Sequence, residues 1–161
     1  MSLLDVIFRR RSIRRYRSEP IPDEVLRNIL EAGRLAPSAD NAQPWHFIVV
    51  TESKIKEKLS GGRWNYFIKD SAVTVVGCGY SDNEWSTVDV ALALENMVIA
   101  AEAQGVGSCW IGDFEEEEVK ELLGIPDNLK VVALVSFGYP AEKPSALNKK
   151  SLKEIVHYNK F

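Results

Sequence analysis

The stretch from Trp85 to Gly112, WSTVDVALALENMVIAAEAQGVGSCWIG, decides the fold that the sequence predicts. As far as Gln104 it is apolar on nearly every side of a helix, and its few charged or amide positions are Asp89, Glu95, Asn96 and Glu102. A helix with so little polar surface is buried on more than one side. Gly105 favours an end to the helix, and residues 107–112 then predict a strand.

The segments on either side of this stretch predict further helices and strands. Ser2 and Asp5 favour capping of a first helix, and Pro22 with Asp23 favours the start of a second, which ends before Pro37. Other helices are expected from about residue 53, over 115–123 and over 151–156, and strands over 46–50, 71–77 and 130–137. Elements interleaved in this way predict a single domain, residues 1–161, around a mixed sheet.

Composition and spacing exclude several classes of protein. No apolar run is long enough to span a bilayer, and the N-terminus lacks the apolar core of a signal peptide, so we expect a cytoplasmic protein without a membrane partner. Cys78 and Cys109 lie far apart, and His46 and His157 have no closely spaced ligand, so no metal site is expected. The glycines in 105–108 follow a helix instead of a strand, which disfavours a dinucleotide-binding motif.

Six arginines fall within residues 9–17, in a chain whose formal net charge is −3. Such a cluster is typical of a solvated face, of a nucleic-acid contact or of a pocket for one phosphate group. The negative net charge and a single interleaved aromatic residue, Tyr16, disfavour nucleic acid as a partner. In an extended stretch Arg10, Ser12 and Arg14 would project to one side, where guanidinium groups and a hydroxyl suit a phosphate better than isolated lysines do.

Four groups of residues occur in an order that is known from one protein family. They are RRSIRRY at 10–16, APSADNAQPW at 36–45, the helix end and strand at 100–112, and GYP at 138–140 with the terminal KKSL at 149–152. On these motifs the sequence resembles the nitroreductase family of FMN-dependent oxidoreductases over almost its whole length. Each motif alone is weakly specific, and their shared order and intervals make the resemblance strong.

The resemblance implies an α+β fold with a central, mostly antiparallel mixed β-sheet flanked by helices. It also implies an obligate homodimer with FMN at the interface, which suits a helix that is apolar on nearly every side. By position, the FMN phosphate is assigned to Arg10, Arg11 and Ser12, and the ribityl chain or the pyrimidine edge to Arg14. A second phosphate contact would come from Lys149 or Lys150, for which a solvated tail is the alternative.

The other two motifs are assigned by the resemblance to the flavin ring. The loop that reaches the flavin of the partner subunit would contain Pro37, Ser38, Ala39 and Asn41, and the segment beside the isoalloxazine would contain Trp110, Ile111 and Gly112. No side chain is assigned as a general base, since the flavin N5 carries the hydride. Ordinary alternatives stay open, with Trp110 and Ile111 as core residues and Ser38 and Asn41 as turn caps.

The function that the resemblance implies is hydride transfer from NADH or NADPH through FMN to an electron-poor small molecule, such as a nitroaromatic or a quinone, by a ping-pong mechanism. A flavin-binding sensor or partner-binding protein without turnover is the alternative, and a nucleic-acid-binding domain is a weaker one. The chain is short for the family and lacks the inserted helices that roof the flavin in larger relatives, so neither the acceptor nor the preferred nicotinamide follows. In the unaligned segment 60–66, Arg63 or Asn65 is a candidate pyrimidine contact.

Overall fold

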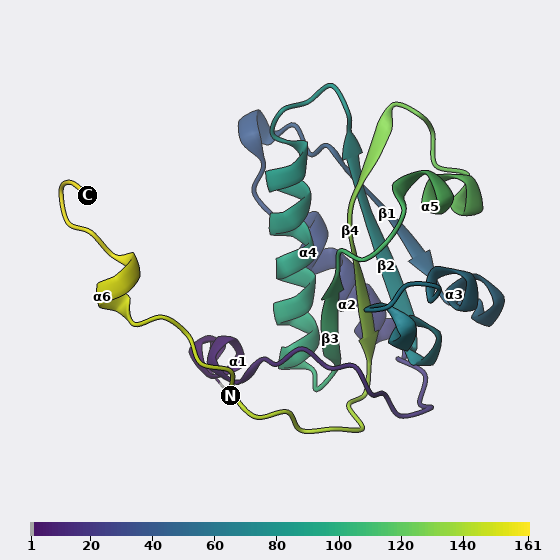
Figure 1. The fold of residues 1–161 in the computed structure, drawn as a ribbon, viewed down its shortest axis with the longest axis horizontal. Helices are drawn as coiled ribbons and strands as arrows, with labels where there is room; N and C mark the ends of the chain where they lie inside the picture. The colour runs from purple at the N-terminus through teal and green to yellow at the C-terminus, as the bar shows by residue number, and fades with distance from the viewer. Residues whose placement is uncertain (1) are drawn as a thin grey trace.

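A computed structural model describes residues 2–161 and contains one four-stranded sheet (Figure 1). Its strands are β1 (Trp45–Val50), β2 (Val73–Tyr80), β3 (Gly107–Ile111) and β4 (Leu129–Gly138), in the spatial order β1-β2-β4-β3. Every neighbouring pair in that order is antiparallel. The parallel component of the expected mixed sheet is an isolated bridge between Ser12 and Ser108, so the mostly antiparallel sheet is confirmed.

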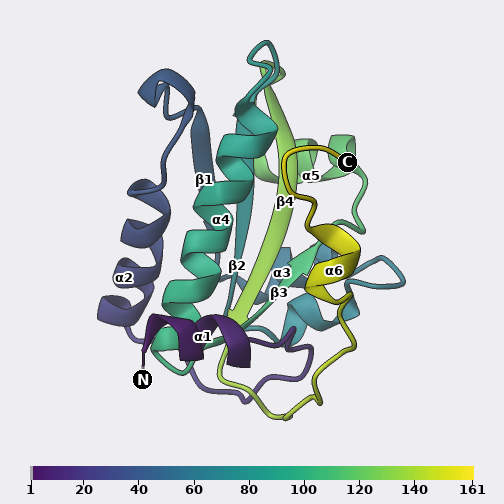
Figure 2. The ribbon, with the colours of Figure 1, turned by 90° about the vertical axis from the view of Figure 1, so that its left-hand side faces the viewer.

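Helices cover both faces of this sheet (Figures 1 and 2). One face carries α2 (Asp23–Arg34) and α4 (Ser86–Ala103), and the other carries α3 (Ser53–Leu59) and α5 (Glu116–Leu123). The α+β architecture is thereby confirmed. The remaining helices are α1 (Leu3–Arg9), α6 (Leu152–Ile155) and the short 3-10 turns η1 (Ala39–Asn41) and η2 (Tyr66–Asp70). The sequence does not predict η2.

The long apolar helix lies where the sequence predicts it, as α4, and the chain turns at Gly105 with a φ of 77°. Its inner side is fully buried against the sheet, through side chains that include Val90, Leu94 and Met97. The opposite side exposes Val88 (47%) and Leu92 (42%) to solvent. A second side of α4 packs against α2, where Gly33 lies against Met97 and Ala93, so burial on more than one side is confirmed within this chain. Val88 and Leu92 leave a further apolar side uncovered.

Two glycines in β2 allow α4 to lie close to the sheet. A Cβ atom added at Gly77 would stand 2.8 Å from Leu94 Cδ1, and one added at Gly79 would stand 2.8 Å from Ser86 Cβ. Both distances are shorter than ordinary carbon contacts. The strand therefore presents bare backbone under the helix, and the helix axis can approach until its own side chains touch the sheet.

The two ends of the chain expose apolar side chains. α1 lies near the C-terminal end of α4, and the last residues, including α6, lead away from the sheet and helices (Figure 1). Exposed apolar side chains on these segments are Leu3, Leu4, Ile7, Phe8, Leu147, Leu152, Ile155, Val156, Tyr158 and Phe161. No helix in residues 2–161 is long and apolar enough to cross a membrane.

Replacing Gly79 by alanine is expected to destabilise the protein by about 1–3 kcal/mol, because the new methyl group would overlap Ser86 Cβ, which a rotamer change cannot move. Urea unfolding followed by circular dichroism measures the change. Gly61→Ala is the control, since a Cβ there has Lys58 O as its nearest neighbour, at 3.8 Å. Equal unfolding midpoints for the two variants would show that helix and strand can separate without cost.

Candidate functional site

A cavity of about 470 Å³ opens at the free edge of β3. It is within the size range of small-molecule sites, about 300–1,000 Å³. Its lining brings together parts of the chain that are far apart in sequence: Arg14, Trp64, Tyr66, Trp110, Ile111, Gly112 and Asp113. The structure therefore joins two of the predicted groups, the arginine segment and the segment 110–112, in one place.

β3 is an edge strand, which suits it to bind a planar heterocycle. It pairs with β4 on one side, and on the other side the isolated bridge from Ser12 reaches Ser108. Within residues 2–161, no further strand pairs with this outer edge. An open edge offers unpaired N–H and C=O groups, which are complementary to the alternating donors and acceptors of a pyrimidine-like ring.

The backbone of the arginine segment is fixed onto the sheet by polar contacts. Ile13 N donates to Ser108 O at 2.9 Å. The Tyr16 hydroxyl donates to Ile13 O at 2.6 Å and lies 2.7 Å from Ser136 Oγ on β4. Burial raises the pKa of Tyr16, so this hydroxyl keeps its proton and acts as a structural donor.

Glu142 holds the same segment from the other side, and the sequence offers no signal for it. Its Oε1 accepts hydrogen bonds from Arg14 N at 2.6 Å and from Arg15 N at 3.1 Å. The carboxylate therefore bonds to the backbone of the arginines and forms no ion pair with their guanidinium groups. This arrangement fixes where the two side chains start and leaves their charges available.

The positive charge of the segment is largely uncompensated. The ion pairs within residues 2–161 are Arg17–Glu19 and Arg34–Glu31, so Arg10 and Arg14 take part in none. Arg11 is partly used, because its Nη1 donates to Phe8 O at 2.9 Å and to Arg10 O at 2.8 Å. Burial raises the pKa of Glu102, and the nearby charges of Arg10 and Arg11 oppose that shift. An anionic ligand would supply the missing counter-charge.

The predicted loop with Pro37, Ser38, Ala39 and Asn41 does not line this cavity. Ala39 N donates to both carboxylate oxygens of Asp89, at 3.3 Å each, near the start of α4. The arginines instead lie beside Glu102, near the end of α4. The two acids lie 13 positions apart, or about 20 Å along the helix. One copy of the chain therefore does not bring this loop to its own arginines.

Lys149 and Lys150 lie in the exposed C-terminal tail, before α6 (Figure 1). Neither side chain makes a hydrogen bond or ion pair to another described residue, which fits a solvated tail lysine as well as a contact with another molecule. Neither lysine is among the residues that line the cavity of their own chain.

Several residues at the cavity have no predicted role. Trp64, Tyr66 and Asp113 form part of its wall. Glu95 on α4 accepts a hydrogen bond from Trp110 Nε1 at 3.0 Å and so fixes that indole. Asn65, a candidate pyrimidine contact, is only 3% exposed, and both polar atoms of its amide are bonded within the protein.

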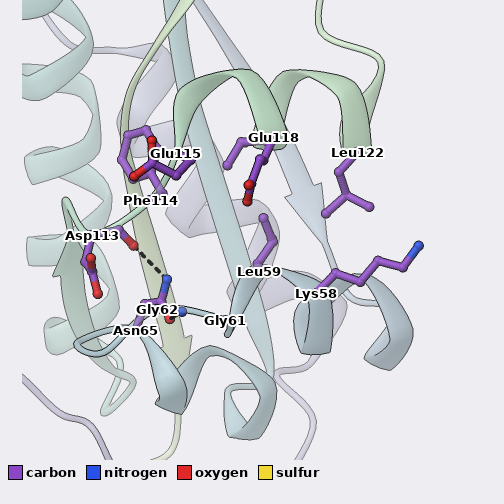
Figure 3. Close-up of a pocket in the computed structure, with 11 residues that line it drawn as sticks. Lys58, Leu59, Gly61, Gly62, Asn65, Asp113, Phe114, Glu115, Glu118 and Leu122 are labelled. Atoms are coloured by element: carbon purple, nitrogen blue, oxygen red, sulfur yellow. Dashed lines mark hydrogen bonds between the residues drawn. The ribbon is translucent and has the colours of Figure 1, made fainter.

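A smaller cavity, about 210 Å³, lies between α3 and α5 (Figure 3). Its lining includes Glu115, Glu118 and one cation, Lys58, around the apolar side chains of Leu59 and Leu122. Among the described residues, no group of three or more His, Cys, Asp or Glu could hold a metal ion. With no arginine and a mostly acidic rim, this cavity does not suit an anion, and the cavity that joins Arg14 to the segment 110–112 is the candidate site.

Known proteins resemble this chain in sequence and in fold. The chain matches the model of the Nitroreductase family over residues 7–61 and 60–139. It is 40% identical over 151 residues to a protein named as an NADH dehydrogenase/NAD(P)H nitroreductase of Archaeoglobus fulgidus, covering 87% of this chain and 86% of that protein. An FMN-dependent nitroreductase from Clostridium difficile superposes with a TM-score of 0.90 at 30% identity, over 98% of this chain and 99% of that one. An NADPH:FMN oxidoreductase from Vibrio harveyi, complexed with NAD+, gives 0.91 at 26% identity, over 99% and 77%.

Neither cysteine is expected to react in the folded protein. Burial raises the pKa of the Cys78 thiol to about 11, and burial also raises the pKa of Cys109, against the effect of the Arg14 charge. At pH 8 a thiol of pKa about 11 is roughly 0.1% thiolate. Iodoacetamide should therefore leave the native protein unmodified and label both cysteines in urea, as measured by mass spectrometry. Rapid native labelling would reveal a reactive thiol at the site.

Proposed function

The chain belongs to the nitroreductase family of NAD(P)H-dependent oxidoreductases, and we propose that it uses FMN to pass electrons from NADH or NADPH to an electron-poor acceptor such as a nitroaromatic or a quinone. The observation that carries the proposal is the cavity in which Arg14 meets the segment Trp110–Gly112 at an open sheet edge. Flavin use by the relatives in Clostridium difficile and Vibrio harveyi supports the same cofactor here.

The residues present fit the two ends of FMN. The phosphate carries close to two negative charges, and Arg10 and Arg14 are arginines without an ion pair, on either side of Ser12 in the sequence. The ring is planar, with donors and acceptors along one edge, and β3 offers free backbone groups along its outer edge. Anion binding and ring binding are therefore available on adjoining segments of the chain.

Bound FMN would supply hydride acceptance and hydride donation at N5, in two half-reactions that share one open pocket. The protein contributes the position of the flavin ring and the electric field around it. Trp110, hydrogen-bonded to Glu95, and the backbone of Ile111 and Gly112 would orient the ring. Arg14 supplies fixed positive charge, which lowers the energy of negative charge that develops in the pocket. No side chain in this scheme has to move a proton.

We propose that the active form is a homodimer in which each copy completes the site of the other. The uncovered face of α4, with Val88 and Leu92, provides an apolar surface for the second copy. The loop 37–41 lies about 20 Å of helix away from the arginines of its own chain, so it is available to a partner's site. The solvated Lys149 and Lys150 could likewise contact the partner's phosphate.

Purified protein is expected to be yellow or to bind added FMN, with flavin absorbance released on denaturation. Under nitrogen, NADH or NADPH should then bleach the flavin, and a nitroaromatic or quinone should restore the colour. Stopped-flow absorbance at the flavin maximum measures both half-reactions. Colourless protein that takes up no FMN contradicts the proposal, while bound flavin that neither nicotinamide bleaches favours the flavin-binding protein without turnover.

Arg10→Ala should weaken FMN binding about 10- to 150-fold, which corresponds to the loss of one charge-assisted phosphate contact of about 1.5–3 kcal/mol. Fluorescence titration of the apoprotein with FMN measures the change. Arg34→Ala removes the same charge from α2, where Arg34 pairs with Glu31 at 2.6 Å, and is the control. Identical titrations for the two variants would place the phosphate elsewhere.

A further inference from the structure

The segment 61–66, a loop that ends at the first residue of η2, forms the outer wall of the candidate cavity. Its two aromatic side chains at the cavity, Trp64 and Tyr66, are 65% and 53% exposed. Exposed aromatic rings on a loop gain little from packing, so something else must hold them at the cavity. Arg63 Cζ lies 4.8 Å from the centre of the Trp64 ring, over one of its faces, and this contact is also on the surface.

A buried amide fixes this loop to the segment that follows β3. Asn65 Nδ2 donates to Asp113 O at 2.6 Å, drawn as a dashed line in Figure 3. Asn65 Oδ1 accepts from Gly62 N at 2.8 Å, and Trp64 N donates to Asp113 Oδ2 at 2.6 Å. We call Gly62, Asn65 and Asp113 the amide latch. It joins residues that lie 48 and 49 positions apart in sequence.

Only a glycine at position 62 lets the backbone lie this close to the side chains of Asn65 and Asp113. A Cβ atom added there would stand 2.7 Å from Asp113 Oδ2 and 2.8 Å from Asn65 Nδ2. Both atoms are engaged in hydrogen bonds, so neither can withdraw without breaking one. The neighbouring Gly61 has no such constraint, with a nearest neighbour at 3.8 Å. A methyl group would therefore collide with the latch at Gly62 and fit without a clash at Gly61.

We propose that the amide latch is a positioning device that holds Trp64 at the mouth of the cavity, and that Trp64 thereby selects planar aromatic acceptors. The inference rests on the proposed function, because it treats this cavity as the place where the acceptor binds. Asp113 directly follows Gly112, so the latch sets the distance between the indole and the segment expected beside the ring. An electron-rich indole stacks favourably on an electron-poor ring such as a nitroaromatic or a quinone.

The test compares Gly62→Ala and Asn65→Ala with the control Gly61→Ala, and with Trp64→Ala. For each holoenzyme, KM and kcat are measured with a nitroaromatic and with ferricyanide, an acceptor that has no ring to stack. Hydrogen exchange of the segment 61–66 and FMN titration of the apoprotein are measured beside them. The latch variants should raise the KM for the nitroaromatic about 3- to 10-fold relative to that for ferricyanide, the range of one aromatic contact.

The same variants should exchange the Trp64 amide faster, bind FMN as the unmodified protein does, and add nothing to the effect of Trp64→Ala in a double variant. Gly61→Ala should change none of these quantities. Faster exchange without a change in the ratio of KM values would overturn the inference, as would a loss of FMN affinity in step with KM. Wild-type protein that binds no FMN would overturn the proposed function itself, a result that differs visibly from both.

Discussion

The close packing of α4 on β2 is the contact on which the other elements depend. Gly77 and Gly79 leave bare backbone under the helix, and the helix buries one apolar side there. Its polar positions contact different parts of the molecule: Asp89 accepts from Ala39 N, Glu95 from Trp110 Nε1, and Asn96 donates to Ala32 O. Glu102 lies within the influence of the Arg10 and Arg11 charges. One helix thus determines where the loop, the ring-binding segment and the arginines lie.

In the arginine segment, the backbone makes the contacts that fix the segment to the sheet, and the guanidinium groups stay available for binding. Its backbone is fixed by Ser108, by the Tyr16 hydroxyl and by the carboxylate of Glu142. The guanidinium groups of Arg10 and Arg14 are not used in that support as ion-pair partners. A cation whose backbone is fixed and whose charge is not neutralised is partly preorganised for an anion, because little backbone freedom remains to be lost on binding.

Features with a local signal could be predicted from the sequence, and contacts between distant segments could not. α4 was expected over 85–104 because its apolar run and Gly105 are contiguous, and it spans Ser86–Ala103. The junction of Arg14 with 110–112 follows from motif resemblance. The wall formed by Trp64 depends on hydrogen bonds to Asp113, 49 residues away, and the support from Glu142 spans 128 residues. Neither contact has a periodicity or a motif in the sequence from which it could be predicted.

The role of α4 as a spacer also limits how the chain can change in length. One residue inserted between Asp89 and Glu95 would rotate all later helix positions by about 100° and advance them by about 1.5 Å. Ala39 would keep its carboxylate, while Trp110 and the arginines would lose the groups that face them. The exposed tail over 143–161 makes hydrogen bonds only within itself among the described residues, so insertions and deletions there leave the sheet undisturbed.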